Sequence, residues 1–370
     1  MPLPLTIEDL TPRWLSDALA QRHPGVAVLA AEPFGTLEGT GTKHFLRVTY
    51  NAAGVAAGLP TQLCVKAGFS AHREAMLFLY QLEARFFAEI APQLDIRVPR
   101  CLHAAADEGQ GIVILEDLNQ TGADFCRVQR TLTRDQATAF LDALAALHAR
   151  WWNSPDLDDP AKLGWLVRHD PLPDDDWGAF GRQQLEPATW AHYAALPRAV
   201  ALPNACRNRE TMHAALQALR RFDPTGPARP QPVCLIHADP HLGNWFIDGD
   251  GGPGLLDWQS PRRGHWAHDV TYMLVSALDP LDRRAWEHDL IRHYLTALAR
   301  NCVATPPEEA EAWTAIRAHI CYGLFYWMVN PVEWQIEVNN VAIAPRFAWA
   351  AVDHDAPPIG QPIAPLSRTG

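Results

Sequence analysis

The sequence lacks the features that mark several broad classes of protein. Its longest apolar stretch, at 137–152, is interrupted by Asp142, His148 and Arg150, well short of the roughly 20 apolar residues that cross a bilayer. It begins without the charged segment and apolar core of a secretory signal. The seven cysteines are scattered and form no Cys-x-x-Cys pair typical of zinc or redox sites. We therefore expect a cytoplasmic protein that does not bind membranes.

Positive charge is also scarce. The 31 Lys and Arg residues face 42 Asp and Glu residues, which gives a formal net charge of -11 and predicts no nucleic-acid partner. What remains is the composition of an ordinary globular protein, with 48% hydrophobic and 20% charged positions in 370 residues. At roughly 100 to 200 residues per domain, this length favours two domains or one bilobal unit.

The hydrophobic pattern changes character near residue 117. Before it, short apolar runs typical of strands accompany two helical patterns, at 12–22 and 75–91; the strand-like runs are 26–29, 44–50, 62–66, 99–103 and 111–115. After it, helical spacing dominates, at 132–152, 186–222, 266–279, 283–301 and 307–329. A short hairpin is expected around 244–256, and the Pro- and Asp-rich segment 154–185 is expected to be irregular. The prediction is an α+β chain with a small antiparallel-sheet lobe at 1–117 and a larger, mostly helical lobe at 118–370.

One motif indicates phosphoryl transfer. His237-Ala-Asp239-Pro-His-Leu-Gly-Asn244 has the spacing of a kinase catalytic loop, and Asp257-Trp-Gln follows thirteen residues after Asn244. The intervening hairpin would return Asp257 beside this loop, so that Asn244 and Asp257 share a magnesium ion while Asp239 takes the proton of an attacking hydroxyl. The alternative is a capped turn in which Asp239 and Asn244 bond only to local backbone.

The first lobe offers groups that could hold a nucleotide. Lys66 ends an apolar strand-like run, an unusual place for lysine, and would hold the α and β phosphates of ATP. Glu83, within the apolar stripe of the next helix, is its expected partner, with Glu74 in reserve. The alternative for Lys66 is a solvent-facing lysine at a strand end.

Two further segments are candidates for nucleotide contacts. The turn between the first two strands contains Gly39, Gly41 and Thr42, whose backbone could approach phosphates, although a plain hairpin turn explains the glycines too. At the junction of the lobes, the backbone of Glu116 and Leu118 would bond to the adenine ring. With these contacts, the lobe at 1–117 binds the nucleotide and the lobe at 118–370 holds the substrate and the catalytic aspartate.

Taken together, these motifs resemble the aminoglycoside phosphotransferase and choline kinase superfamily, and within it the ecdysteroid-kinase-like branch. The resemblance spans about residues 8 to 350 and implies a bilobal protein-kinase-like fold, ATP and Mg²⁺ as cofactors, Asp239 as catalytic base, and Asn244 and Asp257 as metal ligands. It also implies that Asp269 braces the catalytic loop. Two departures are visible: Ala238 stands where a glycine is usual, and Gln259 stands where protein kinases have glycine.

The expected reaction is transfer of the γ-phosphate of ATP to a hydroxyl of a small, fairly apolar alcohol, which the many tryptophans would suit. Aminoglycosides and choline are the alternative acceptors, and the oligomeric state is left open. Two other classes of function also remain. The histidines and aspartates of 237–269 could form a metal-dependent hydrolase site, or the chain could be a catalytically silent pseudokinase that only binds nucleotide.

Overall fold

The computed structural model describes residues 2–70, 73–222 and 231–356. The chain separates into two compact units. Unit 1 contains residues 1–125 together with 244–261, and unit 2 contains 126–243 together with 262–370. The expected boundary at 117 differs from this division, because residues 118–125 and the hairpin after Asn244 pack with the first unit. The reason is strand pairing, since Asp124 and Phe125 pair with Ile247 and Phe246.

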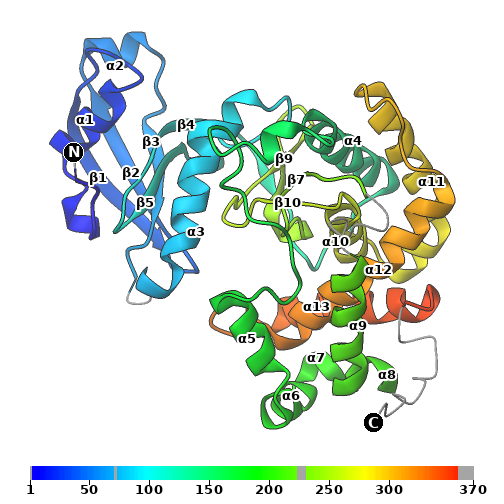
Figure 1. Ribbon diagram of the computed structural model, residues 1–370. Coiled ribbons are helices and arrows are strands. Elements are labelled where there is room, and N and C mark those ends of the chain that lie inside the picture. The colour runs from blue at the N-terminus through cyan, green and yellow to red at the C-terminus, as the bar shows by residue number, and fades with distance from the viewer. Residues whose placement is uncertain (1, 71–72, 223–230, 357–370) are drawn as a thin grey trace. The chain divides into compact units, whose positions relative to one another are not determined.

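Unit 1 is built on a five-stranded antiparallel sheet in the order β1-β2-β3-β5-β4 (Figure 1). Its strands are β1 (Val28–Leu37), β2 (Thr42–Tyr50), β3 (Gln62–Ala67), β4 (Cys101–Ala106) and β5 (Gly111–Glu116). Its helices are α1 (Pro12–Ala20), α2 (Ala52–Ala56) and α3 (Arg73–Arg85), and α3 continues as one π-helical segment, Phe86–Ile90. A second small sheet joins β6 (Asp124–Phe125), β8 (Trp245–Ile247) and β9 (Pro253–Leu255).

The sheet of unit 1 presents two different faces. Successive side chains of a strand point to opposite sides, so Leu63 and Val65 lie in the apolar cluster that also buries Leu15 of α1. Lys66 belongs to the other face, which α3 covers (Figure 1). Strand β3 is buried on both faces, so its lysine, Lys66, faces helix α3 rather than water.

Unit 2 is mostly helical. Its helices are α4 (Arg134–Arg150), α5 (Asp176–Gln184), α6 (Pro187–Ala194), α7 (Pro197–Val200), α8 (Asn204–Arg207), α9 (Arg209–Phe222), α10 (Ala267–Ala277), α11 (Pro280–Arg300), α12 (Glu309–Val329) and α13 (Glu337–Asp353). Two short strands, β7 (Cys234–Ile236) and β10 (Arg262–Gly264), pair antiparallel. Every residue of α10 is buried, so this helix forms the centre of the unit, with α4, α12 and α13 packed against it.

The fold class agrees with the sequence-based prediction, but one local expectation is wrong and one helix was not predicted. The segment 154–185 is not wholly irregular, because Asp175 accepts a hydrogen bond from the Gly178 N–H and caps α5. The pattern also gave no sign of α13, which contains Pro345. Proline removes a backbone donor, and burial of Ile343, Ala344 and Phe347 in unit 2 stabilises the helix despite that loss. Within the described residues, no helix is long and apolar enough to span a membrane.

Candidate active site

Unit 1 gathers three of the candidate residues around one ammonium group. Lys66 Nζ lies 2.8 Å from Glu83 Oε1 of α3 and 2.8 Å from Asp257 Oδ1. Lys66 and Glu83 are almost fully buried, with 4% and 3% of their surface exposed. Glu74, the reserve candidate, lies exposed in the first turn of α3. The alternative of a solvent-facing lysine is therefore wrong.

The electrostatics of this cluster follow from its charges. Burial by itself lowers the pKa of the Lys66 ammonium, but the carboxylates of Asp257 and Glu83 outweigh burial and raise that pKa above its ordinary value. The pKa of Glu83 is raised by its own burial, only partly offset by Lys66, and the nearby Asp257 carboxylate raises it further. One ammonium thus pairs with two carboxyl groups, those of Glu83 and Asp257.

The hairpin formed by β8 and β9 begins next to Asn244 and ends just before Asp257. β8 and β9 pair from Trp245 opposite Leu255, and the N–H of Leu256 donates to the carbonyl oxygen of Asn244 at 2.8 Å. Asn244 is buried and the Asp257 side chain is partly exposed. Both are oxygen ligands of the kind that Mg²⁺ prefers, so these two residues fit the predicted ion chemically.

The aspartate is held in place by its neighbours. The Trp258 ring stacks on Phe86 with ring centres 3.9 Å apart, and its indole N–H donates to the Leu255 carbonyl at 3.3 Å. Asp257 itself has φ of 59°, in the left-handed region that costs a residue other than glycine free energy. Such strain persists only where surrounding contacts impose it, and it is concentrated at functional sites.

The glycine-rich turn between β1 and β2 brings one glycine close to the lysine cluster. A Cβ added to Gly41 would lie 2.8 Å from Gln259 Nε2 and 3.1 Å from Lys66 Cε, so a larger residue would require the ends of these two side chains to shift. A Cβ on Gly39 would meet only an ordinary contact at 3.7 Å. Thr42 is buried at the start of β2, opposite Ala67. The structure places Gly41, but not Gly39, against the lysine cluster.

The two residues proposed to contact adenine lie where β5 ends. The Glu116 N–H donates to the Arg100 carbonyl and its carboxylate accepts the Arg100 N–H, so this residue belongs to the sheet. Leu118 begins a short 3-10 turn, Leu118–Gln120, that Asp117 caps through a hydrogen bond from the Asn119 N–H. The chain therefore leaves the sheet within two residues.

In unit 2, the loop that carries Asp239 is fixed through its backbone. Asp269 at the start of α10 accepts hydrogen bonds from the His237 N–H at 2.6 Å and the Ala238 N–H at 3.0 Å. Burial alone would raise the pKa of Asp269, but the hydrogen bond from His148 and the surrounding histidines outweigh burial, and the pKa lies below its ordinary value. An ionised carboxylate thus braces the loop, while 44% of the Asp239 side chain stays exposed.

The histidines of the loop serve its geometry. The Asp239 N–H donates to His237 Nδ1 at 3.2 Å, and the Gly243 N–H donates to His241 Nδ1 at 3.0 Å. Because each Nδ1 accepts, each neutral ring carries its proton on Nε2. The His241 Nε2 lies 3.9 Å from Asp239 Oδ2. His237 is fully buried, as expected for a hydrogen-bonding support.

Sequence reasoning missed two residues that hold this loop. His148 of α4 lies 3.3 Å from Asp269 Oδ2 through Nε2 and 2.7 Å from the Tyr294 hydroxyl through Nδ1. Ser276 Oγ accepts a hydrogen bond from the Leu242 N–H at 3.1 Å. The signal for His148 was a lone polar residue on the apolar face of a helix, which indicates a buried hydrogen bond without revealing its partner.

The side chains that a metal-dependent hydrolase would need as ligands already make other hydrogen bonds. Asp269 accepts two backbone N–H groups, His265 Nδ1 accepts the Ala267 N–H at 3.1 Å, and His268 Nε2 bonds to the Ala238 carbonyl at 2.8 Å. In the part of the chain that the structure describes, no three His, Cys, Asp or Glu residues are grouped so that they could hold a metal. Each histidine of 237–269 uses one ring nitrogen in a hydrogen bond to the backbone.

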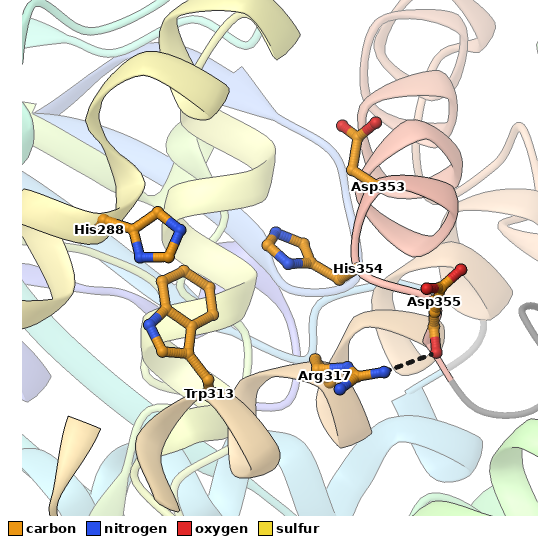
Figure 2. Close-up of a pocket in the computed structure, with 6 residues that line it drawn as sticks. All are labelled: His288, Trp313, Arg317, Asp353, His354 and Asp355. Atoms are coloured by element: carbon orange, nitrogen blue, oxygen red, sulfur yellow. Dashed lines mark hydrogen bonds between the residues drawn. The ribbon is translucent and has the colours of Figure 1, made fainter. Parts of the chain in front are cut away.

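A cavity elsewhere in unit 2 contains none of the candidate residues. Figure 2 shows six residues that line a volume of about 270 Å³ between α11, α12 and the end of α13: His288, Trp313, Arg317, Asp353, His354 and Asp355. The Trp313 ring lies 4.6 Å from His288 and 5.2 Å from His354. Arg317 bonds to the Asp355 carbonyl at 3.2 Å.

Comparison with solved structures identifies the fold. An aminopropanol kinase associated with a microcompartment superimposes with a TM-score of 0.51 at 14% identity, over 93% of this chain and 98% of that one. A macrolide 2'-phosphotransferase from Brachybacterium faecium has a TM-score of 0.46 at 19% identity, over 90% and 98%. A choline kinase from Streptococcus pneumoniae has 0.48 at 11%, over 91% and 98%. The predicted protein-kinase-like fold is confirmed.

Comparison with curated protein sequences finds no match. Comparison with protein families does: residues 78–304, more than half of the chain, match the model of the phosphotransferase enzyme family. The matched range includes Glu83, Asp239, Asn244 and Asp257, and begins after Lys66. The prediction of a phosphotransferase enzyme is confirmed at this level, and the chain belongs to the phosphotransferase enzyme family.

Proposed function

We propose that this protein is an ATP-dependent kinase that transfers the γ-phosphate of ATP to a hydroxyl of a small molecule. The observation that carries this proposal is the buried cluster of Lys66, Glu83 and Asp257. A lysine in that setting is a fixed positive charge suited to the α and β phosphates. Family membership indicates phosphoryl transfer, and the buried cluster indicates where the phosphates of the nucleotide would bind.

The nucleotide-binding groups belong to unit 1. Asn244 and Asp257 would hold Mg²⁺, which when bound neutralises negative charge on the phosphates. The Gly41 backbone and the start of β2 at Thr42 would contact phosphate, with Gly39 in the same turn. The backbone of Glu116 and Leu118 would bond to adenine. The partly exposed Asp257 carboxylate supports a cation at this place.

The chemical step belongs to Asp239. Its carboxylate would take the proton of the acceptor hydroxyl as that oxygen bonds to the γ-phosphorus, while the bond from the γ-phosphorus to the bridging oxygen breaks and ADP leaves. The loop contacts support this role, because Asp269 and His237 fix the backbone around Asp239 while its carboxylate reaches solvent.

The acceptor we propose is a small, fairly apolar alcohol, as in the ecdysteroid-kinase-like branch. Unit 2 supports this choice with a cluster of half-buried aromatic rings: Trp177, Phe180, Tyr326 and Trp334, whose neighbouring centres lie 4.9 to 5.9 Å apart. Aromatic faces bind apolar rings, and they also bind quaternary ammonium groups, so choline remains the alternative acceptor beside aminoglycosides. The cytoplasm, where ATP is available and where thiols stay reduced, is the compartment that fits.

The test is mass spectrometry of a library of hydroxyl compounds incubated with Mg-ATP and either the wild-type protein or Asp239→Asn. We expect a product heavier by one phosphoryl group with the wild type only. The library includes aminoglycosides and choline, and better turnover of either would overturn the apolar acceptor without affecting the reaction.

A binding measurement accompanies the library. Wild-type protein that binds Mg-ATP but phosphorylates no compound would favour the pseudokinase alternative, and protein that does not bind Mg-ATP would contradict the proposed function. Equal product from wild type and Asp239→Asn would remove Asp239 from the role of base.

A further inference from the structure

The residue before the proposed base has an unusual backbone. Ala238 has φ of 68°, in the left-handed region, and it is buried. Alanine pays a steric cost there that glycine does not, because its Cβ crowds the following carbonyl oxygen. This conformation determines the direction in which the chain enters Asp239, so whatever maintains it also positions the carboxylate.

Two side chains from α10 hold Ala238 by opposite ends of its backbone. Asp269 Oδ1 accepts the Ala238 N–H at 3.0 Å, and His268 Nε2 lies 2.8 Å from the Ala238 carbonyl oxygen. A carbonyl oxygen only accepts, so His268 Nε2 must donate. Among the described residues the other ring nitrogen, Nδ1, has no hydrogen-bond partner. The bond to Ala238 is therefore the polar interaction that fixes this imidazole.

The surroundings keep the His268 ring in one orientation and one charge state. The ring is 1% exposed and packs between His169 and Tyr322, with ring centres 4.0 and 4.7 Å away. Burial lowers the pKa of His268 below its ordinary value, although the Asp269 carboxylate opposes that effect. A neutral imidazole with its proton on Nε2 is the form that the contact requires.

We propose that His268 is a positioning residue that clamps Ala238 in the left-handed conformation and so sets the orientation of Asp239. The clamp does for this chain what the conformational freedom of a glycine would do at position 238. The catalytic part of this inference rests on the proposed function, in which Asp239 is the base. The conformational part rests only on the contact between His268 and Ala238.

The distinguishing experiment is a rescue. His268→Phe keeps a ring of similar shape but removes the donor, so the strained alanine can relax; we expect kcat for phosphoryl transfer to fall about ten-fold, with the KM for ATP unchanged. Adding Ala238→Gly removes the strain, and the double variant should regain most of that loss. His268→Gln, which keeps a donor near the Nε2 position, should retain most of the rate.

His319 provides the matched control. Its ring is also buried, lies 6.1 Å from His268, and bonds through Nδ1 to the Ala315 carbonyl of its own helix. His319→Phe should cost stability, and Ala238→Gly should change the stability of this variant by no more than it changes that of the wild type. If Ala238→Gly rescues both histidine variants equally, or rescues neither, the proposal that His268 holds Ala238 is wrong.

A second readout separates this inference from the proposed function. In urea unfolding, His268→Phe should lower the midpoint more in the wild-type background than together with Ala238→Gly, because only alanine needs the clamp. Additive effects on the midpoint would overturn the inference even if the rates changed. If the wild-type protein shows no phosphoryl transfer, the proposed function fails, and the unfolding cycle still decides whether His268 holds Ala238.

Discussion

The two units fix their functional residues by opposite electrostatic means. In unit 1, Lys66 is held by direct charge pairing with Glu83 and Asp257. In unit 2, the loop of Asp239 is held by backbone hydrogen bonds to one buried carboxylate, Asp269, among histidines that burial keeps neutral. The difference suits the tasks that we propose for the two units. A phosphate site needs fixed charge, whereas a base must be aimed while its own carboxylate stays accessible.

The comparison indicates which change would disrupt the lysine cluster of unit 1 and which would disrupt the loop of Asp239 in unit 2. Charge pairs fail when one partner is removed, because the other is left buried and uncompensated. A loop held by neutral imidazoles fails when these are protonated or when the backbone they hold can relax. The following predictions separate these two kinds of failure.

The largest effect should distinguish the two aspartates that we assign to the reaction. Asp239→Asn should lower kcat about a thousand-fold or more while leaving Mg-ATP affinity nearly unchanged, because a general base acts only in the chemical step. Asp257→Asn should lower both kcat and Mg-ATP affinity. Calorimetric titration with Mg-ATP alongside steady-state rates measures both. Equal losses of affinity in the two variants would contradict the division of tasks.

Removal of the buried cation should destabilise unit 1. Lys66→Met leaves the Glu83 and Asp257 carboxylates without their partner, so we expect a loss of about 3 kcal/mol in the free energy of unfolding. Lys43, its neighbour on β2, is only half-buried, and Lys43→Met should cost less than about 0.5 kcal/mol. Urea unfolding of both variants measures these losses. Similar losses would mean that the buried charge cluster contributes no more to the free energy of unfolding than a half-buried lysine does.

The glycine-rich turn offers a pair of matched substitutions. Gly41→Ala places a methyl group 2.8 Å from Gln259 Nε2 and 3.1 Å from Lys66 Cε, so the ends of these side chains or the turn itself must shift. We expect Mg-ATP affinity to fall roughly ten-fold, the equivalent of about 1.4 kcal/mol. Gly39→Ala meets nothing closer than 3.7 Å and should bind almost as the wild type does. A larger loss from Gly39→Ala would place the phosphate contact at the other glycine.

The last comparison concerns the acid sensitivity of the two units. Burial lowers the pKa of His169, His265, His268 and His319 in unit 2, the last to about 3, and of His103 in unit 1 to about 4. Below pH 6.5 the unfolded state binds protons that these folded histidines do not. Stability should therefore fall as the pH drops from about 6.5, by up to about 1.4 kcal/mol per pH unit for each histidine.

Unit 2 should lose protection first, because it contains more of these histidines. Hydrogen exchange followed by mass spectrometry at pH 7 and pH 5, corrected for intrinsic exchange rates, measures the two units separately. His319→Gln should flatten the pH dependence in unit 2 and leave unit 1 as it was. Equal acid sensitivity of the units would show that neutral histidines do not control stability here.

Much of the site was predictable because its signals are local. The spacing from His237 to Asn244 and the hairpin before Asp257 lie within one short stretch, and a lysine within an apolar strand-like run is unusual by itself. The contacts of His268 and His148 were not predictable. His268 bonds thirty residues back to Ala238, and His148 reaches Asp269 from a different helix. No local pattern encodes such distances.

The same reasoning explains the two misjudged elements. A helix of nine residues that contains Gly178 and Gly181 has little intrinsic propensity, so α5 depends on its cap and its packing. In α13, Pro345 argues against a helix by local rules, and tertiary burial of the flanking apolar residues prevails.

The sequence alone determined the reaction class and the residue types, because the order and spacing of a lysine, an asparagine and two aspartates are read directly from the chain. The tertiary structure alone decided that Glu83 pairs with Lys66, that Gly41 rather than Gly39 approaches the lysine, and that Ala238 adopts a left-handed conformation between Asp269 and His268. The physical reason is the separation along the sequence over which each interaction acts. Periodicity and spacing act over a few residues, whereas burial, charge pairing and backbone strain depend on what the folded chain brings alongside.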